Sequence, residues 1–141
     1  MVLSKEEREE FLAQPHIGAL SVVERPDRAP LTVPIWYQYT PGGPLWVRTA
    51  PGSRKARAIA AAGRFSLMVQ RTTPSVRYVS VEGPVTGPEP DDAERAREMA
   101  ARYLPPDQVD GFLAYEREHL GEHAVLYLHP EHWLSADLGP G

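Results

Sequence analysis

Hydrophobic and polar side chains alternate along several short stretches of this chain, which is the pattern of β-strands with one buried face. In the stretch 77–82, Val79 and Val81 point to one face and Tyr78 points to the other. Turn residues separate such stretches, as at 41–44, where the sequence Pro-Gly-Gly-Pro predicts a hairpin. Strands are therefore expected over residues 17–23, 31–39, 45–49, 64–70, 76–85, 124–128 and 133–136.

Helices are expected where capping residues precede helix-forming stretches. A capping box joins a polar N-cap to a glutamate three residues later, and a serine followed by alanines is a good simple cap. The predicted helices are 5–13 after the box Ser4–Glu7, 54–62 between Ser53 and Gly63, a helix from the box Asp91–Glu94 to about Tyr103, and 107–119.

The order and number of these elements predict the fold class. About six antiparallel strands in a chain of 141 residues favour a small barrel, because closing a sheet removes its exposed edges. Pro34 has no N–H to donate, so the strand 31–39 requires an edge position or a bulge. We predict a mainly β (α+β) fold in a single domain over residues 1–141, with a flexible tail at 137–141.

Composition and charge limit the classes of partner. The chain has 15 Lys and Arg against 19 Asp and Glu, for a formal net charge of −4, which argues against nucleic acid or an anionic membrane as the main partner. It has no cysteine, which excludes disulfides and thiolate metal sites. No stretch has the apolar length of a signal peptide or a membrane span, so a cytoplasmic protein is expected.

The stretch from Thr49 to Arg57 carries the most informative chemistry. It places Ser53 and three cations, Arg54, Lys55 and Arg57, where a strand ends and a helix begins. Cations at a helix N-terminus are unfavourable against the helix dipole, and an anionic ligand would remove that conflict. The stretch therefore indicates a phosphate or carboxylate site; a solvated basic turn is the alternative.

Histidines suggest a second, weaker chemistry. His119 and His123 lie four residues apart, a spacing that can place two metal ligands on one helix face. Gly121 lies between them and is expected to end the helix, so we predict exposed histidines and no metal site.

Three motifs together resemble a known family. They are Thr-x-x-Gly-Ser-Arg-Lys-Ala-Arg at 49–57, Arg-Phe-Ser-Leu at 64–67 and Arg-Tyr-Val-Ser-Val-Glu-Gly at 77–83. The stretch 31–83 that contains them resembles the core of the pyridoxamine 5′-phosphate oxidase-like split β-barrel flavoproteins. The resemblance implies a six-stranded antiparallel split β-barrel, and a homodimer with its cofactors at the subunit interface.

The resemblance also implies roles for individual residues. Arg54 and Lys55 would bind the cofactor phosphate, residues 33–36 would lie along the cofactor ring, and residues 76–78 would approach it from the partner subunit. Tyr78 is a candidate proton donor. The candidate cofactor-binding residues are Val33, Pro34, Ile35, Trp36, Arg48, Thr49, Ser53, Arg54, Lys55, Arg57, Val76, Arg77 and Tyr78.

Departures from the oxidase indicate a different branch of the family. Thr32 stands where the oxidase has an arginine and Tyr78 where it has a glutamine, so vitamin B6 oxidation is not expected. The short chain, with Trp36-Tyr37 and an Arg-Tyr-Val segment, resembles the branch that uses the deazaflavin coenzyme F-420. F-420 carries a phosphodiester and an oligoglutamate tail, and the cations at positions 48, 54, 55, 57 and 77 could bind these anions.

The resulting functional prediction is an oxidoreductase that transfers hydride from F-420 to a small conjugated organic substrate. In such an enzyme the cofactor supplies the reactive chemistry, while the protein binds and orients it. Two alternatives remain open: an FMN-dependent oxidase or reductase on the same fold, and a non-catalytic protein that binds FMN or haem.

Overall fold

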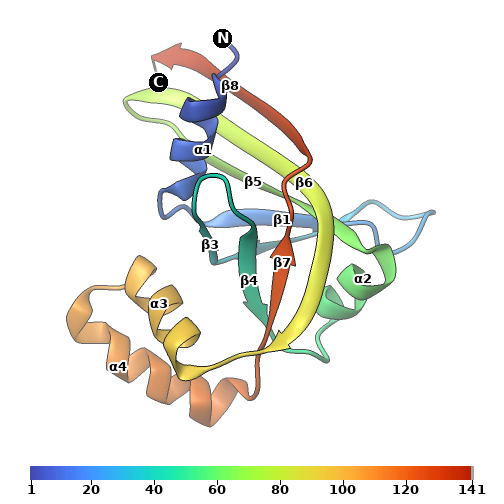
Figure 1. The fold of residues 1–141 in the computed structure, drawn as a ribbon, viewed down its shortest axis with the longest axis vertical. Helices are drawn as coiled ribbons and strands as arrows, with labels where there is room; N and C mark the ends of the chain where they lie inside the picture. Colours follow the sequence, from blue (N-terminus) through green and yellow to red (C-terminus); the bar gives the residue numbers. More distant parts are fainter. Residues whose placement is uncertain (141) are drawn as a thin grey trace.

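A computed structural model describes residues 1–140 (Figure 1). Eight strands form instead of about six: each of the seven predicted stretches forms strand, and the stretch 31–39 is divided into two strands at Trp36. The elements are α1 (Lys5–Ala13), β1 (Gly18–Val22), β2 (Leu31–Ile35), β3 (Tyr37–Tyr39), β4 (Leu45–Thr49), α2 (Arg54–Ala62), β5 (Arg64–Arg71), β6 (Ser75–Pro90), α3 (Ala93–Tyr103), α4 (Pro106–Tyr115), η1 (Glu116–Leu120), β7 (Ala124–Leu128) and β8 (His132–Pro140).

The sheet is antiparallel throughout and curls into a half-barrel (Figure 1). Its strand order is β2-β1-β5-β6-β7-β4-β3, with β8 paired to β6. The two ends of this order, β2 and β3, are consecutive in the chain and are joined by Trp36. Pro34 lies on the edge strand β2, opposite Ala19 of β1, where its missing N–H costs no ladder bond. The mainly antiparallel α+β fold predicted from the sequence is confirmed.

Capping signals set the helix boundaries as predicted for α1 and α2. The backbone N–H of Glu7 donates to Ser4 Oγ over 3.1 Å, and the Ser4 N–H donates to the Glu7 carboxylate over 2.9 Å. Ser53 caps α2, and Gly63 ends it with a left-handed φ of 74°. Within residues 1–140, none of the helices has both the length and the apolar character needed to cross a membrane.

Two predicted helix boundaries are wrong. Asp92, rather than Asp91, caps α3, because its carboxylate accepts the Arg95 N–H over 2.7 Å. The helix predicted over 107–119 is α-helical only to Tyr115 and continues as the π-helix η1.

The prediction of a flexible tail is also wrong for residues 137–140, which belong to strand β8 and pair with the start of β6. Asp137 anchors this end of the strand: it accepts bonds from Arg77 Nε over 2.9 Å and from Ser75 Oγ over 2.7 Å. These donors, with the Gly139 N–H, hold the pKa of Asp137 at about 2. Gly141 lies outside the described residues.

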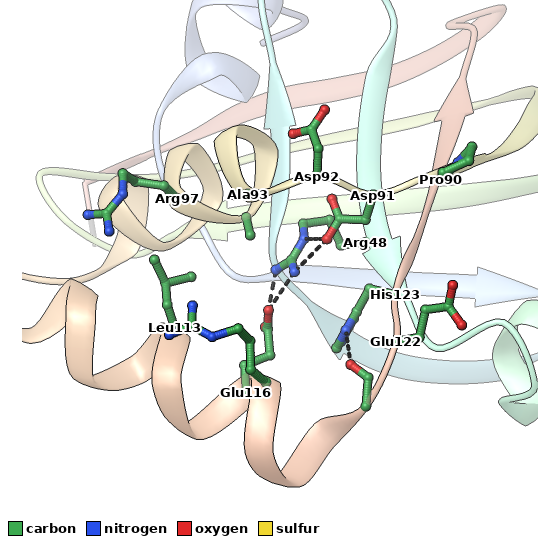
Figure 2. A pocket seen from close by; sticks show the side chains of 13 residues that line it. Arg48, Pro90, Asp91, Asp92, Ala93, Arg97, Leu113, Glu116, Glu122 and His123 are labelled. Atoms are coloured by element: carbon green, nitrogen blue, oxygen red, sulfur yellow. Dashed lines mark hydrogen bonds and ion pairs between the residues drawn. The ribbon is translucent and has the colours of Figure 1, made fainter.

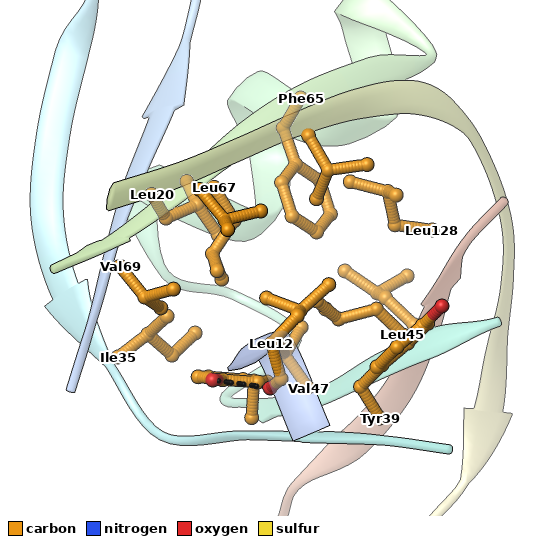
Figure 3. Close-up of a cluster of buried hydrophobic side chains, with 14 of the residues drawn as sticks. Leu12, Leu20, Ile35, Tyr39, Leu45, Val47, Phe65, Leu67, Val69 and Leu128 are labelled. Atoms are coloured by element: carbon orange, nitrogen blue, oxygen red, sulfur yellow. Dashed lines mark hydrogen bonds between the residues drawn. The ribbon is translucent and has the colours of Figure 1, made fainter. Parts of the chain in front are cut away.

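One hydrophobic core fills the half-barrel (Figure 3). It joins Leu12 of α1 to the inward side chains of both sides of the sheet, such as Leu67 and Leu128, which are fully buried. Each such leucine stabilises the fold by roughly 1.5–3 kcal/mol through its buried apolar surface. Ala58 and Ile59 anchor α2 in the same core, and this fixes the position of the helix N-terminus.

Candidate functional site

The N-terminus of α2 has the geometry of an anion site. Ser53 Oγ accepts the Ala56 N–H and lies 3.2 Å from Thr49 Oγ1, so the cap joins the end of β4 to the helix. The first-turn N–H groups of α2 have no acceptor within the helix, and its first turn contains no acidic residue. Their partial positive charge therefore lies beside the three predicted cations.

The three cations of α2 differ in their partners. Arg54 donates to both oxygens of Glu24, over 2.7 Å and 2.6 Å, and these hydrogen bonds lower the pKa of the Glu24 carboxyl. Lys55 is half-buried, and this burial lowers the pKa of its ammonium group. In the part of the chain that the structure describes, neither Lys55 nor Arg57 forms an ion pair. Lys55 and Arg57 are thus the uncompensated cations of this helix start.

A small cavity of about 210 Å³ lies beside the same helix. Thr49 and Arg57 supply its polar lining, and the remaining walls are mostly apolar side chains of α2, β6 and β7. The cavity therefore adjoins the helix start without containing Arg54 or Lys55.

Arg48, unlike these cations, is enclosed by two carboxylates (Figure 2). Its guanidinium contacts Asp91 at 2.7 Å and also pairs with Glu116, and only 7%, 12% and 9% of these three side chains is exposed. Burial lowers the pKa of Arg48, but its hydrogen bonds to the two carboxylates outweigh burial and raise it. The three residues line a cavity of about 340 Å³ at the start of α3. The charge of Arg48 is therefore compensated within the chain, unlike that of Lys55.

The four predicted ring-contacting residues of 33–36 do not share one face. Val33 and Ile35 pack against the core, whereas Pro34 is exposed on the outer face of the sheet. Trp36 points toward the α3–α4 pair and stacks on Tyr103 with a centroid separation of 4.8 Å. Of these side chains, only Pro34 is presented to a ligand on the outer face.

Residues 76–78 lie at the start of β6, three strand positions away from β2 in the same sheet. Arg77 points inward, pairs with Asp137 and lies over the Phe11 ring, so Val76 and Tyr78 face outward. Strands β1 and β5 separate β6 from the edge strand β2, a span of three strand spacings or about 14 Å. Tyr78 and Pro34 of one chain are therefore too far apart to contact the same atoms of a ligand.

Sequence reasoning missed Glu24, Asp91 and Glu116 as partners of the predicted cations. Glu24 is 30 residues from Arg54, and Glu116 is 68 residues from Arg48, so no local spacing relates them. A buried position for Glu116 is the unusual feature, since glutamate is almost never fully buried unless paired.

The two predicted histidines make contacts of other kinds. His119 packs against Tyr115 with a centroid separation of 4.5 Å, and a ring nitrogen of His123 lies 3.1 Å from the Gly121 carbonyl. Over residues 1–140, no three His, Asp or Glu side chains converge in a geometry that could hold a metal ion.

Comparison with known families identifies the fold. The family model described as pyridoxamine 5′-phosphate oxidase matches residues 4–136. The chain belongs to this family. The match spans nearly every element, from the α1 cap to β8, and so includes the whole α2 site. A comparison with curated protein sequences gave no match.

Solved structures similar to this member of the pyridoxamine 5′-phosphate oxidase family support the same architecture. A conserved hypothetical protein from Mycobacterium tuberculosis is 21% identical, with a TM-score of 0.71, over 97% of this chain and 86% of that chain. An F-420 reductase is 21% identical, with a TM-score of 0.62, over 89% and 94% of the two chains. An FAD-binding protein from Mesorhizobium loti is 21% identical, with a TM-score of 0.66, over 97% and 95%.

Proposed function

We propose that this protein is a homodimeric oxidoreductase that uses coenzyme F-420 to transfer hydride to a small conjugated organic substrate. The observation that carries the proposal is the cationic N-terminus of α2, where Lys55 and Arg57 lack carboxylate partners in the described part of the chain. Free N–H groups, a serine cap and a half-buried ammonium form the donor set that a phosphate requires. The residues present therefore fit a phosphate-bearing cofactor.

In this proposal, the bound deazaflavin supplies the hydride, and the protein binds and orients it. Ser53, Lys55 and the first-turn N–H groups of α2 hold the phosphate. The outer face near Pro34 would receive the ring, and the partner's Tyr78 would donate to the substrate the proton that balances the hydride. Tyr78 faces outward on β6, as this role requires, because its neighbours Arg77 and Val79 face inward.

Homodimerisation is supported by the outer face of the sheet. Pro34, Met68, Tyr78 and Leu134 lie on this face in the strands β2, β5, β6 and β8. Leu134 is 65% exposed, although leucine is usually buried. A second copy packed against this face would cover these side chains and bring its Tyr78 toward β2.

FMN is the second candidate cofactor, because the α2 donor set suits any phosphate ester. Similarity to both an F-420 reductase and an FAD-binding protein supports a flavin-type cofactor in general. The F-420 assignment is supported further by Arg57, a cation beyond the phosphate donors of α2 that could bind a carboxylate of the oligoglutamate tail.

The proposal is tested by titrating purified protein with F-420, FMN and haem, followed by a reductase screen with the tightest ligand. We expect saturable binding of F-420, and we expect Lys55→Ala to weaken it about 10- to 100-fold, because a charge-assisted bond is lost. Lys5→Ala, at the only other lysine of the chain, is the matched control and should leave the dissociation constant unchanged. Tightest binding of FMN would favour the second candidate, and no binding of either cofactor would refute the proposal.

A further inference from the structure

Glu24 forms an ion pair with Arg54, the arginine that was predicted to bind the cofactor phosphate. It lies two residues beyond the end of β1, and its two oxygens accept from Arg54 Nε over 2.7 Å and from Nη2 over 2.6 Å. This is the two-pronged geometry in which arginine also binds phosphate. A phosphate that uses Arg54 in the same way must displace the Glu24 carboxylate.

The pair is accessible enough for such an exchange. Arg54 is 61% exposed and Glu24 is 24% exposed, and exposed ion pairs contribute little to stability. After displacement, however, Glu24 stays next to the site, because the backbone holds it only two residues beyond the end of β1. Its negative charge then repels the bound anion, and this repulsion grows with the charge of the anion.

The possible cofactors differ in this charge. The phosphomonoester of FMN carries between one and a half and two negative charges near neutral pH, whereas the phosphodiester of F-420 carries one. A phosphodiester also needs fewer donors, which Lys55 and the α2 N–H groups supply while the Glu24–Arg54 pair remains closed. The carboxylate of Glu24 therefore penalises the monoester more than the diester.

We infer that Glu24 is a specificity-determining residue that selects against phosphomonoesters and in favour of phosphodiesters at the N-terminus of α2. The inference rests on the proposed function for the location of the cofactor phosphate. In this role, Glu24 weakens the binding of phosphomonoesters by charge repulsion, and repulsion of a competing ligand is a common route to specificity.

The test measures the dissociation constants of FMN and F-420 for the wild-type protein and for Glu24→Gln. We expect Glu24→Gln to tighten FMN about fivefold and F-420 less than twofold, so that the preference between them moves toward FMN. Glu10→Gln, on the exposed surface of α1, removes the same charge elsewhere and should change neither constant. In an Arg54→Gln background, Glu24→Gln should change the FMN dissociation constant less, because no guanidinium remains for the loss of Glu24 to free.

A cofactor-free probe separates this inference from the proposed function. Methyl phosphate and dimethyl phosphate reproduce the two charge classes. Backbone amide shifts in the first turn of α2 report their binding by NMR, and the Arg54 Nε–Hε resonance reports whether Glu24 is displaced. If the wild-type protein binds neither cofactor, the proposed function fails, and the ratio of affinities for these two esters still decides the role of Glu24. An equal shift for both esters, a weaker affinity in Glu24→Gln, or no response of Arg54 to either ester would overturn the inference.

Discussion

At Gly83, the backbone of β6 is in close contact with the backbone of the segment that connects β7 to β8. The connection between β7 and β8 crosses the strand there, with the His129 N–H donating to the Pro84 carbonyl and the Glu131 N–H donating to the Glu82 carbonyl, both over 2.9 Å. A Cβ atom at Gly83 would overlap the His129 carbonyl oxygen, which is backbone and cannot rotate away. The absence of a side chain at this position therefore allows β8 to leave β7 and pair with β6.

We expect Gly83→Ala to lower the free energy of unfolding by about 3 kcal/mol, because the crossing segment must shift to relieve the overlap. Urea denaturation at 25 °C measures this change. Gly111→Ala is the matched control: apart from the adjacent backbone of its own helix, no atom lies within 4 Å of its new methyl group. Alanine in the helix α4 should stabilise the fold by about 0.5–1 kcal/mol. Equal stability of Gly83→Ala and wild type would contradict the steric argument.

At the scale of elements, the Arg48 cluster joins β4, the start of α3 and the start of η1 (Figure 2). Asp91 immediately precedes the α3 cap, and Glu116 is the first residue of the π-helix. The wider π turn begins where Glu116 reaches the guanidinium, and π-helical turns are often found at functional positions. The α3–α4 pair is therefore held to the sheet by this cluster at one end and by Trp36 stacked on Tyr103 at the other.

Replacing Arg48 tests how strongly this cluster holds the helices. We expect Arg48→Met to cost about 3–5 kcal/mol of unfolding free energy, because it leaves two buried carboxylates without a cation. Adding Glu116→Leu should restore part of the loss, since one of those charges is then removed. The control is Arg97→Met, whose partner Asp110 is 84% exposed, and which should cost less than about 1 kcal/mol. Similar losses for the two arginines would show that burial is not the cause.

At the scale of the whole molecule, the two faces of the sheet have different character. The inner face is filled by the core, whereas Leu134 is exposed on the outer face. The α1 helix and the α3–α4 pair lie elsewhere and leave this face open. A second copy is the occupant consistent with the proposed cofactor site, because Tyr78 and Pro34 must come from different chains to meet one ligand.

If the proposed dimer forms through this face, we expect Leu134→Glu to convert it into a monomer, because a charge would be buried in the interface. Sedimentation velocity at several protein concentrations measures the change. Leu120→Glu, at an exposed leucine of η1, introduces the same charge away from this face and should leave the dimer intact. Dimerisation that survives Leu134→Glu would place the interface elsewhere.

Local signals determined much of this protein. The Ser4 box, the Ser53 cap and the alternation from 77 to 82 act over a few residues, so α1, α2 and the inward faces of the strands could be predicted from the sequence. The concentration of cations at the start of α2 is likewise visible in the sequence, because a helix cap fixes where its N–H groups lie.

Only the tertiary structure decided which of the predicted cofactor-binding cations, Arg48 included, are compensated by carboxylates. Glu24 reaches Arg54 because β1 ends beside α2, and Glu116 reaches Arg48 because α4 returns to the sheet; both contacts join residues far apart in sequence. The division of a predicted strand at Trp36 has the same origin, since that residue turns outward to stack on a helix 67 positions later. Spacing along a chain specifies local hydrogen bonds, whereas long-range packing specifies which charges meet.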